Sequence, residues 1–184
     1  MPLFPAMLPT PDAYWVDHPT PYSGRLLAGE YPGAKDPREA IRKLGRYLDA
    51  GVMTFIDLTE EDEYGLRPYA AEAGKLAAAR GTALTHLRWP IHDLTTPSPA
   101  QMARILDAID DALAAGQTVY VHCYGGIGRT GTVIGCWLVR HGLSGAAALE
   151  RIAAWRVGTP DGARPSPESA AQRRMIVQWS ELSQ

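Results

Sequence analysis

The fold of this chain is decided by one stretch, Thr118-Val119-Tyr120-Val121-His122-Cys123-Tyr124-Gly125-Gly126-Ile127-Gly128-Arg129-Thr130-Gly131. Its first four residues predict a short buried strand. Residues 130–139 continue with a second apolar run, which is typical of the beginning of a buried helix. Cys123 therefore lies at a strand-to-helix turn, and Arg129 lies at the other end of the same glycine-rich loop.

The backbone of such a loop favours an anion. Successive N–H groups point inward and the following helix adds the positive end of its dipole, so the concavity suits a dianionic phosphate. The same field stabilises a thiolate, because a cysteine at a helix N-terminus beside a cation titrates at roughly 3.5–7.5. Arg129 is that cation, and its planar fork can hold two phosphate oxygens at once. Three glycines leave the anion unobstructed: Gly125, Gly126 and Gly128.

The pattern of His-Cys, five residues and Arg-Thr resembles the signature loop of the cysteine-dependent protein tyrosine and dual-specificity phosphatases. The resemblance implies that Cys123 is the nucleophile and that Arg129 binds the phosphate. It also implies that His122 tunes the thiolate through hydrogen bonds, while the Thr130 hydroxyl is expected to donate to the Cys123 sulfur. The phosphate is expected to bind on the loop positions Tyr124, Gly125, Gly126, Ile127, Gly128 and Arg129.

A phosphocysteine mechanism needs an acid for the leaving oxygen and the same group as a base for the attacking water. Asp93 is the candidate, because it follows an apolar strand and begins a loop punctuated by proline. Its place thirty residues before Cys123 resembles the spacing of the compact dual-specificity phosphatases. His92 is the rival acid.

Two further polar residues have alternative interpretations. Gln172 follows a Pro-Glu helix start. Its position is similar to that of a glutamine that places the hydrolytic water in several branches of the phosphatase family. The alternative is an ordinary polar residue on a surface helix. Asp57 is interpreted as a strand-end residue that caps a turn, with a second acid as the alternative.

The order of the predicted elements indicates an α/β fold: a mostly parallel central sheet of four to five strands flanked by helices on both faces, as the resemblance to tyrosine phosphatases also implies. Residues 1–23 are rich in proline and predict an extended N-terminal arm, followed by a single domain over residues 24–184. Strands are expected near residues 25–29, 52–58, 83–89 and 118–121. Helices are expected near residues 37–50, 68–79, 98–115, 130–141, 144–157 and 167–182.

Composition excludes several classes of protein. A net charge of −2 gives no global attraction to nucleic acid or to an anionic membrane, and no apolar run is long enough to span a bilayer. The N-terminus does not read as a secretory signal, and no histidine spacing indicates a metal site, so we expect no metal and no cofactor. Cys136 is expected to be a buried apolar residue. A catalytic thiol at Cys123 fits a reduced cytoplasm, and we expect a monomer.

Three functions follow from the loop. The first is hydrolysis of phosphotyrosine, with phosphoserine or phosphothreonine as further substrates. The second is a phosphatase of the same mechanism that acts on inositol phosphates or phosphoinositides, where lysines are often found at loop positions that Tyr124 and Ile127 occupy here. The third is a catalytically dead adaptor that binds a phosphorylated protein, although such adaptors usually lose the nucleophile, the arginine or the acid.

Overall fold

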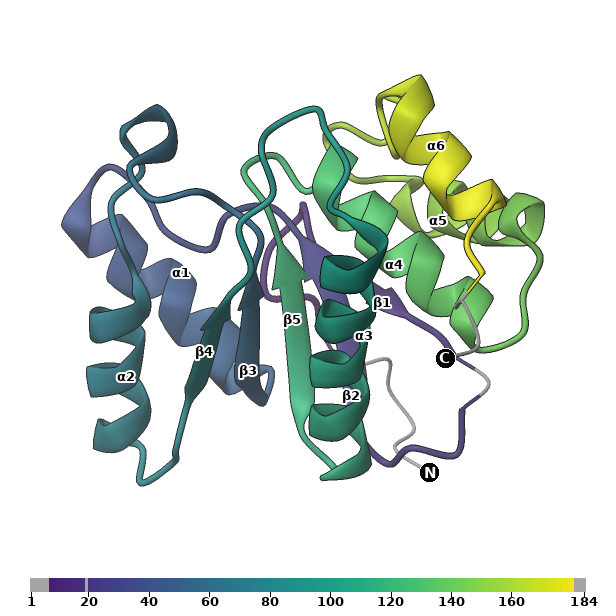
Figure 1. The fold of residues 1–184 in the computed structure, drawn as a ribbon. Helices are drawn as coiled ribbons and strands as arrows, with labels where there is room; N and C mark the ends of the chain where they lie inside the picture. The colour runs from purple at the N-terminus through teal and green to yellow at the C-terminus, as the bar shows by residue number, and fades with distance from the viewer. Residues whose placement is uncertain (1–6, 19, 181–184) are drawn as a thin grey trace.

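The computed structural model describes residues 7–18 and 20–180, and its centre is a sheet with strand order β1-β2-β5-β3-β4 (Figure 1). The strands span Tyr14–Val16 (β1), Arg25–Gly29 (β2), Val52–Asp57 (β3), Thr85–Arg88 (β4) and Thr118–His122 (β5). Of these described strands, β1 is antiparallel to its neighbour β2, and the other pairs are parallel. The prediction of a mostly parallel sheet is therefore confirmed.

The register of the parallel strands aligns their carboxyl ends. His122 lies opposite Gly29 on one side and opposite Asp57 on the other, and Asp57 lies opposite Arg88. The segments that leave β2, β3, β4 and β5 therefore begin at one edge of the sheet, which is the edge where open α/β sheets bind ligands.

Among the described residues, six α-helices cover the two faces of the sheet, with α1 and α2 on one side and α3 to α6 on the other (Figure 1). Their bounds are Pro37–Asp49 (α1), Ala70–Ala79 (α2), Pro99–Ala114 (α3), Gly128–Arg140 (α4), Gly145–Arg156 (α5) and Ala170–Val177 (α6). Side-chain N-caps fix the starts of four of them, at Asp36, Ser98, Ser144 and Ser169. Helices on both faces were predicted and are confirmed.

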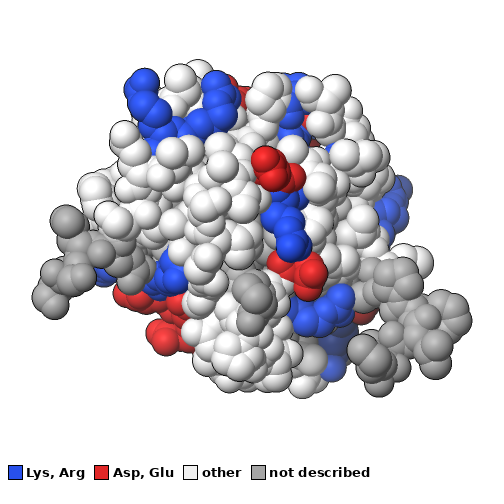
Figure 2. Space-filling model, turned by 90° about the vertical axis from the view of Figure 1, so that its right-hand side faces the viewer, with Lys and Arg blue, Asp and Glu red and all other residues white. Residues whose placement is uncertain are grey.

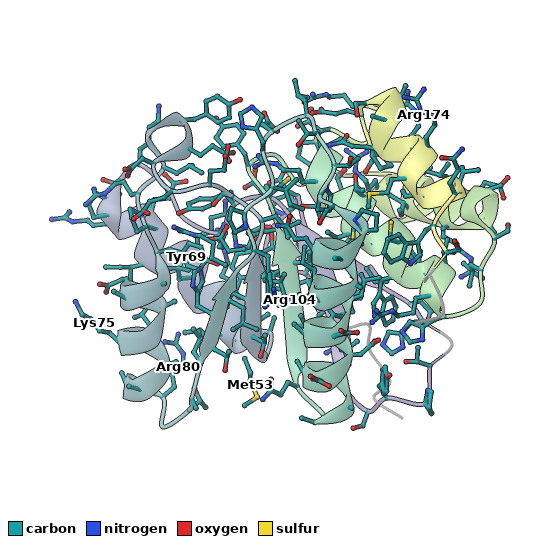
Figure 3. The ribbon with its side chains drawn as sticks, in the orientation of Figure 1. Met53, Tyr69, Lys75, Arg80, Arg104 and Arg174 are labelled. Atoms are coloured by element: carbon teal, nitrogen blue, oxygen red, sulfur yellow. The ribbon has the colours of Figure 1, made fainter. Side chains whose placement is uncertain are left out.

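The two faces of the sheet have different cores. The face under α3 and α4 is mainly aliphatic, with Trp137 as its largest fully buried side chain. The face under α1 and α2 is aromatic, and the rings of Tyr47, Phe55 and Tyr120 pack with centroids 4.5–6.1 Å apart. Tyr69 lies between α2 and the sheet, whereas Lys75 points outward (Figure 3). The aromatic face thus reaches the ligand edge of the sheet.

The proline-rich segment 1–23 contributes β1, which the sequence analysis did not predict. Tyr14–Val16 pairs with Leu26–Ala28 at the edge of the sheet. A three-residue strand is too short to leave an alternating pattern between prolines. Residues 1–6 and 19 lie outside the described residues, as do residues 181–184 at the end of the predicted last helix, whose described span is Ala170–Val177.

Candidate active site

The predicted phosphate loop connects β5 to α4. Cys123 follows β5 directly and is 3 % exposed, at the bottom of the loop. Gly126 has a φ of +69°, and a Cβ at this position would lie 2.6 Å from the main-chain N of Glu30. The loop passes so close to the chain after β2 that only glycine fits at Gly126.

Arg129 stands in the first turn of α4 and is 1 % exposed. Its Nη1 and Nη2 donate to the two carboxylate oxygens of Glu63 at 2.7 and 2.6 Å, and Nη1 also donates to the Ile91 carbonyl at 3.0 Å. Burial disfavours the charged guanidinium, but the hydrogen bonds to Glu63 and the charges of nearby acidic groups outweigh it and raise the pKa of Arg129. Arg129 Nε is buried without a partner among the described residues, so it is free to donate to a phosphate oxygen.

Asp93 reaches the same guanidinium from the loop after β4. Its Oδ1 lies 3.2 Å from Arg129 Nη2, and its Oδ2 accepts a hydrogen bond of 2.8 Å from the Tyr64 hydroxyl. The carboxylate is 29 % exposed and lines the same pocket as Cys123. The structure therefore brings the predicted nucleophile, arginine and acid together.

His122 lies beneath the loop and is fully buried. Its Nδ1 is 3.3 Å from the Cys123 carbonyl, which can only accept, so Nδ1 carries the proton and Nε2 accepts from the Tyr69 hydroxyl at 2.6 Å. Burial lowers the pKa of His122 from 6.5 to about 4, although Asp57 at 3.9 Å acts in the opposite direction. His122 is therefore neutral near pH 7 and contacts the main chain of Cys123.

Thr130 lies in the first turn of α4, and the Gln172 side chain lies close to Gly128 in the same turn. The Thr130 hydroxyl donates to the Gly29 carbonyl at 3.4 Å, whereas the sequence analysis expected it to donate to the Cys123 sulfur. The Gln172 amide donates to the Thr95 carbonyl at 3.1 Å, and its side chain would lie about 3 Å from a Cβ at Gly128. Gln172 thus links α6 to the loop that carries Asp93 and borders the phosphate loop.

The surroundings of three other residues bear on the roles considered for them in the sequence analysis. Asp57 is fully buried and caps the turn after β3, since its Oδ1 accepts from the N–H and hydroxyl of Thr59. His92, the rival acid, is an exposed residue that pairs with Glu60 and does not line the pocket. Cys136 is buried in α4, where desolvation raises the pKa of its thiol to about 12.

Glu63 and Tyr64 were missed by the sequence analysis. Both belong to η1, the short 3₁₀ turn Glu63–Gly65 after β3, and they contact Arg129 and Asp93 respectively. The sequence could have indicated them only by their place after β3. This strand is the neighbour of β5, and the loop that follows it begins at the edge of the sheet where ligands bind. Residues 60–63 are all acidic, so the sequence gave no reason to select Glu63 as the partner of Arg129.

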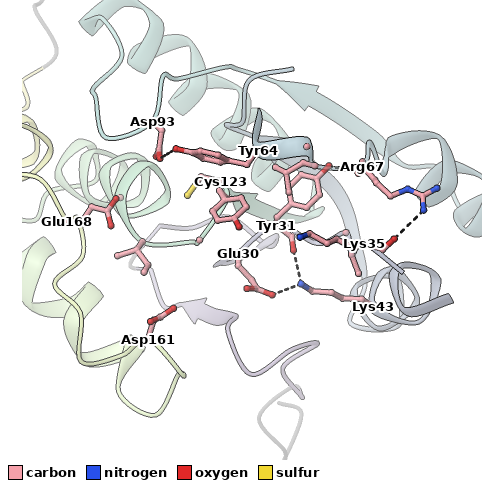
Figure 4. Close-up of a pocket in the computed structure, with 18 of the residues that line it drawn as sticks. Glu30, Tyr31, Lys35, Lys43, Tyr64, Arg67, Asp93, Cys123, Asp161 and Glu168 are labelled. Atoms are coloured by element: carbon pink, nitrogen blue, oxygen red, sulfur yellow. Dashed lines mark hydrogen bonds and ion pairs between the residues drawn. The ribbon is translucent and has the colours of Figure 1, made fainter. Parts of the chain in front are cut away.

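The pocket above Cys123 has a volume of about 520 Å³ (Figure 4). Its floor is the phosphate loop, and Tyr31, Tyr64 and Tyr124 contribute aromatic surface. Lys43 is paired with Glu30, whereas Lys35 and Arg67 line the wall without a carboxylate partner among the described residues. The pocket is large enough for a phosphomonoester together with a ring or a second anionic group.

The rest of the surface carries no single dominant charge on the side of α5 and α6. Lysines, arginines and acidic residues are interspersed there with uncharged surface (Figure 2). Within residues 7–18 and 20–180, no three histidine, cysteine or acidic side chains are grouped as a metal would require. Within the same ranges, no helix combines the length and apolar character needed to cross a bilayer.

Comparison with known proteins identifies the class of this fold and site. Residues 31–143 match the family described as "Polymorphic toxin system, DSP-PTPase phosphatase". The match covers more than half of the chain and includes the phosphate loop, Asp93 and η1. The chain therefore belongs to this family of dual-specificity and tyrosine phosphatases.

Individual relatives agree with this class. The chain is 36 % identical over 141 residues to the phosphatidylglycerophosphate phosphatase PTPMT2 of Arabidopsis thaliana, covering 75 % of this chain and 54 % of the relative. It is 39 % identical over 91 residues to the mouse dual specificity protein phosphatase CDC14B, covering 47 % of this chain and 17 % of the relative. It thus spans about half or less of these curated relatives.

A solved structure extends the similarity to the whole fold. The crystal structure of Tk-PTP in its active form is similar with a TM-score of 0.62 and 27 % identity, covering 83 % of this chain and 88 % of that one. Kinase-associated phosphatase shares the fold with a TM-score of 0.66 at 19 % identity, covering 91 % of this chain and 93 % of that one.

Proposed function

We propose that this chain hydrolyses phosphomonoesters on proteins, with phosphotyrosine as the main substrate and phosphoserine or phosphothreonine as further substrates. The observation that carries the proposal is that Cys123 and Asp93 line one pocket, while the buried Arg129 contacts this acid, with Asp93 Oδ1 3.2 Å from Arg129 Nη2. Membership of a family of dual-specificity and tyrosine phosphatases supports the same reaction.

The reaction proceeds in two displacements at phosphorus. The Cys123 thiolate forms the S–P bond while the P–O bond to the leaving group breaks, and Asp93 gives its proton to the departing oxygen. Water then attacks the phosphocysteine, its proton passes to Asp93, and the S–P bond breaks to release inorganic phosphate. Arg129 stabilises the charge of the transferring phosphoryl group in both steps, because its fork is already held in place by Glu63.

The remaining loop residues support these steps. Main-chain N–H groups from Tyr124 to Arg129 bind the phosphoryl oxygens, and neutral His122 fixes the main chain of Cys123 through its 3.3 Å contact. Gln172 places the hydrolytic water once its contact with Thr95 opens, and the Thr130 hydroxyl stabilises the leaving thiolate after a change of rotamer.

Turnover of p-nitrophenyl phosphate tests the proposal. Wild type is expected to release nitrophenol steadily, whereas Cys123→Ser is expected to fall to the background rate because it lacks the thiolate. Cys136→Ala is the matched control, since Cys136 is buried in α4 away from the pocket and should keep wild-type turnover. Full activity in Cys123→Ser would show that another group attacks the phosphorus.

A phospholipid or inositol phosphate substrate is the second candidate. Two observations favour it: the similarity to the phosphatidylglycerophosphate phosphatase, and the cations Lys35 and Arg67 on the wall of the pocket. Such a substrate carries another phosphate besides the scissile one. Parallel assays with phosphotyrosine peptides, phosphoserine peptides, phosphatidylglycerophosphate and inositol hexakisphosphate rank the candidates by kcat/KM.

The cellular setting is proposed on chemical grounds. A thiolate at Cys123 remains active only where it stays reduced. This requirement supports a cytoplasmic location for the protein. We also propose a monomer that binds a phosphorylated protein or a small phosphomonoester and does not insert into a membrane. A net charge of only −2 gives no global attraction to nucleic acid, so we propose no nucleic-acid partner.

A further inference from the structure

The turn η1 holds both charged catalytic groups with two consecutive residues. Glu63 binds Arg129 through both carboxylate oxygens, and the next residue, Tyr64, donates its hydroxyl to Asp93 Oδ2 at 2.8 Å. Asp93 and Arg129 are themselves 3.2 Å apart. A single short turn therefore fixes the relative positions of the phosphate-binding cation and the acid.

The backbone of this turn is unfavourable in isolation. Asp62 and Tyr64 have φ values of +57° and +50°, in the left-handed region that side chains other than glycine rarely adopt. Such residues persist where surrounding contacts hold them, and they concentrate at functional sites. The contacts here are made by the neighbouring Glu63, which accepts from the Glu60 N–H and binds Arg129. The strained turn is thus maintained by its contact with the catalytic arginine.

The ring of Tyr64 is exposed at the mouth of the pocket. It is 64 % exposed and lies 5.1 Å from the ring of Tyr124, which is 49 % exposed, with an angle of 58° between the planes. Both rings line the pocket that contains Cys123, and Tyr64 lies beside Asp93 (Figure 4). Neither ring is buried in a core, so packing alone does not account for this pair.

We propose that Tyr64 positions the acid Asp93 through its hydroxyl, and that its ring forms with Tyr124 a subsite for an aryl leaving group. The inference rests on the proposed function. A phenyl ring that packs against the pocket side of Tyr64 and Tyr124 brings its ester oxygen towards the carboxyl group that Tyr64 holds, so recognition of the ring and delivery of the proton are coupled. Alkyl phosphates gain only the contact with the acid. The substrate class is therefore aryl phosphates, above all phosphotyrosine.

The hydroxyl and the ring can be separated by substitution. Tyr64→Phe removes the hydrogen bond to Asp93 and keeps the ring, whereas Tyr64→Leu removes both. Each variant is assayed with phenyl phosphates whose phenols differ in acidity and with an alkyl phosphate. Tyr22→Phe is the matched control, because Tyr22 packs on His141 outside the pocket and should behave as wild type.

Tyr64→Phe is expected to lower kcat for phenyl phosphates of poor leaving groups by about 3- to 10-fold, the range for one hydrogen bond, and to change KM little. Good leaving groups need no acid and should be almost unaffected. Tyr64→Leu should in addition raise KM for phenyl phosphates more than for the alkyl phosphate. In an Asp93→Asn background, Tyr64→Phe should have no further effect, because Tyr64 acts through Asp93. An equal loss for all leaving groups, or full additivity with Asp93→Asn, would overturn the positioning role.

Hydrogen exchange separates this inference from the proposed function. The amides of residues 91–96 should exchange faster in Tyr64→Phe than in wild type, whether or not the protein turns over a phosphate ester. An unchanged exchange rate would show that the hydrogen bond from Tyr64 to Asp93 does not hold this loop, even if Cys123→Ser abolishes activity. If wild type showed no turnover but exchange was faster in Tyr64→Phe, the proposed reaction would be rejected. The positioning of Asp93 by Tyr64 would still be supported.

Discussion

The phosphate loop and the two segments that face it are held in place in different ways. The loop runs from Cys123 to Arg129 without interruption between β5 and α4, and every residue from Gly126 to Arg129 is buried. The facing segments, η1 and the loop around Asp93, lie far apart in the sequence. They contact Arg129 at the end of the phosphate loop through the side chains of Glu63 and Asp93 and through the carbonyl of Ile91.

The contrast shows that binding and proton transfer depend on different kinds of stability. The loop presents backbone N–H groups whose directions are fixed by local geometry and by a helix start. Asp93 is placed by Tyr64 and Arg129, and the residue after it, Leu94, has a φ of +62°. Changes in the loop should therefore abolish phosphate binding, whereas changes in the facing segments should mainly lower kcat, because those segments position Asp93 and Arg129.

The largest effect is expected from Gly126→Ala. A methyl group at Gly126 would overlap the main chain of Gly29 and Glu30, and the φ of +69° is unfavourable for alanine. A displaced loop loses oriented donors, so kcat/KM for p-nitrophenyl phosphate should fall by about 10²- to 10³-fold. Gly74→Ala is the control, since its Cβ meets nothing within 4 Å in the middle of α2 and should add about 0.5–1 kcal/mol of stability. Activity within threefold of wild type in Gly126→Ala would contradict the view that the local path of the loop is essential.

This difference also explains what could be predicted from sequence. The strand, the loop and the helix are consecutive, so the residues between Thr118 and Gly131 contain the whole arrangement, and Asp93 followed from its place after a strand. Glu63 and Tyr64 could not be predicted, because their partners are 66 and 29 residues away in the sequence. The contact of the Thr130 hydroxyl could not be predicted for the same reason, because its partner is the Gly29 carbonyl on the neighbouring strand β2.

A smaller effect is expected from Glu63→Gln. Glutamine keeps the shape of the side chain but loses the charge that binds both Nη atoms of Arg129. A hydrogen bond between charged groups contributes about 1.5–3 kcal/mol, so kcat should fall about 10-fold or more, and the melting temperature should drop. The measurement is steady-state kinetics together with thermal unfolding.

Glu60→Gln is the matched control for this variant. Glu60 comes from the same acidic run but pairs with the exposed His92, so both readouts should stay at the wild-type level. If the two variants lost the same activity, the effect would come from the charge of the run as a whole and not from the contact with Arg129.

The last effect is on stability and not on turnover, and it concerns His122, through which the phosphate loop does depend on distant residues. Burial holds the pKa of His122 at about 4, against 6.5 when it is exposed. Between about pH 6.5 and pH 4, His122 is therefore protonated in the unfolded chain and neutral in the folded chain. The free energy of unfolding should decrease as the pH falls through this range, by at most about 3 kcal/mol. Asp57 has a lowered pKa, so its contribution is lost only below its usual value of 3.8, outside this window.

Urea unfolding across this window measures the slope. His122→Gln should flatten it, because glutamine can still accept from Tyr69 but does not titrate. Burial also lowers the pKa of His18, which is only partly buried and remote from the loop, so His18→Gln should remove a smaller part of the slope. If both variants kept the wild-type slope, neutral His122 would not be the group that links acid pH to the loop. A larger loss of slope in His122→Gln than in His18→Gln would show that the buried His122 beneath the loop is the main group that links acid pH to the stability of the fold.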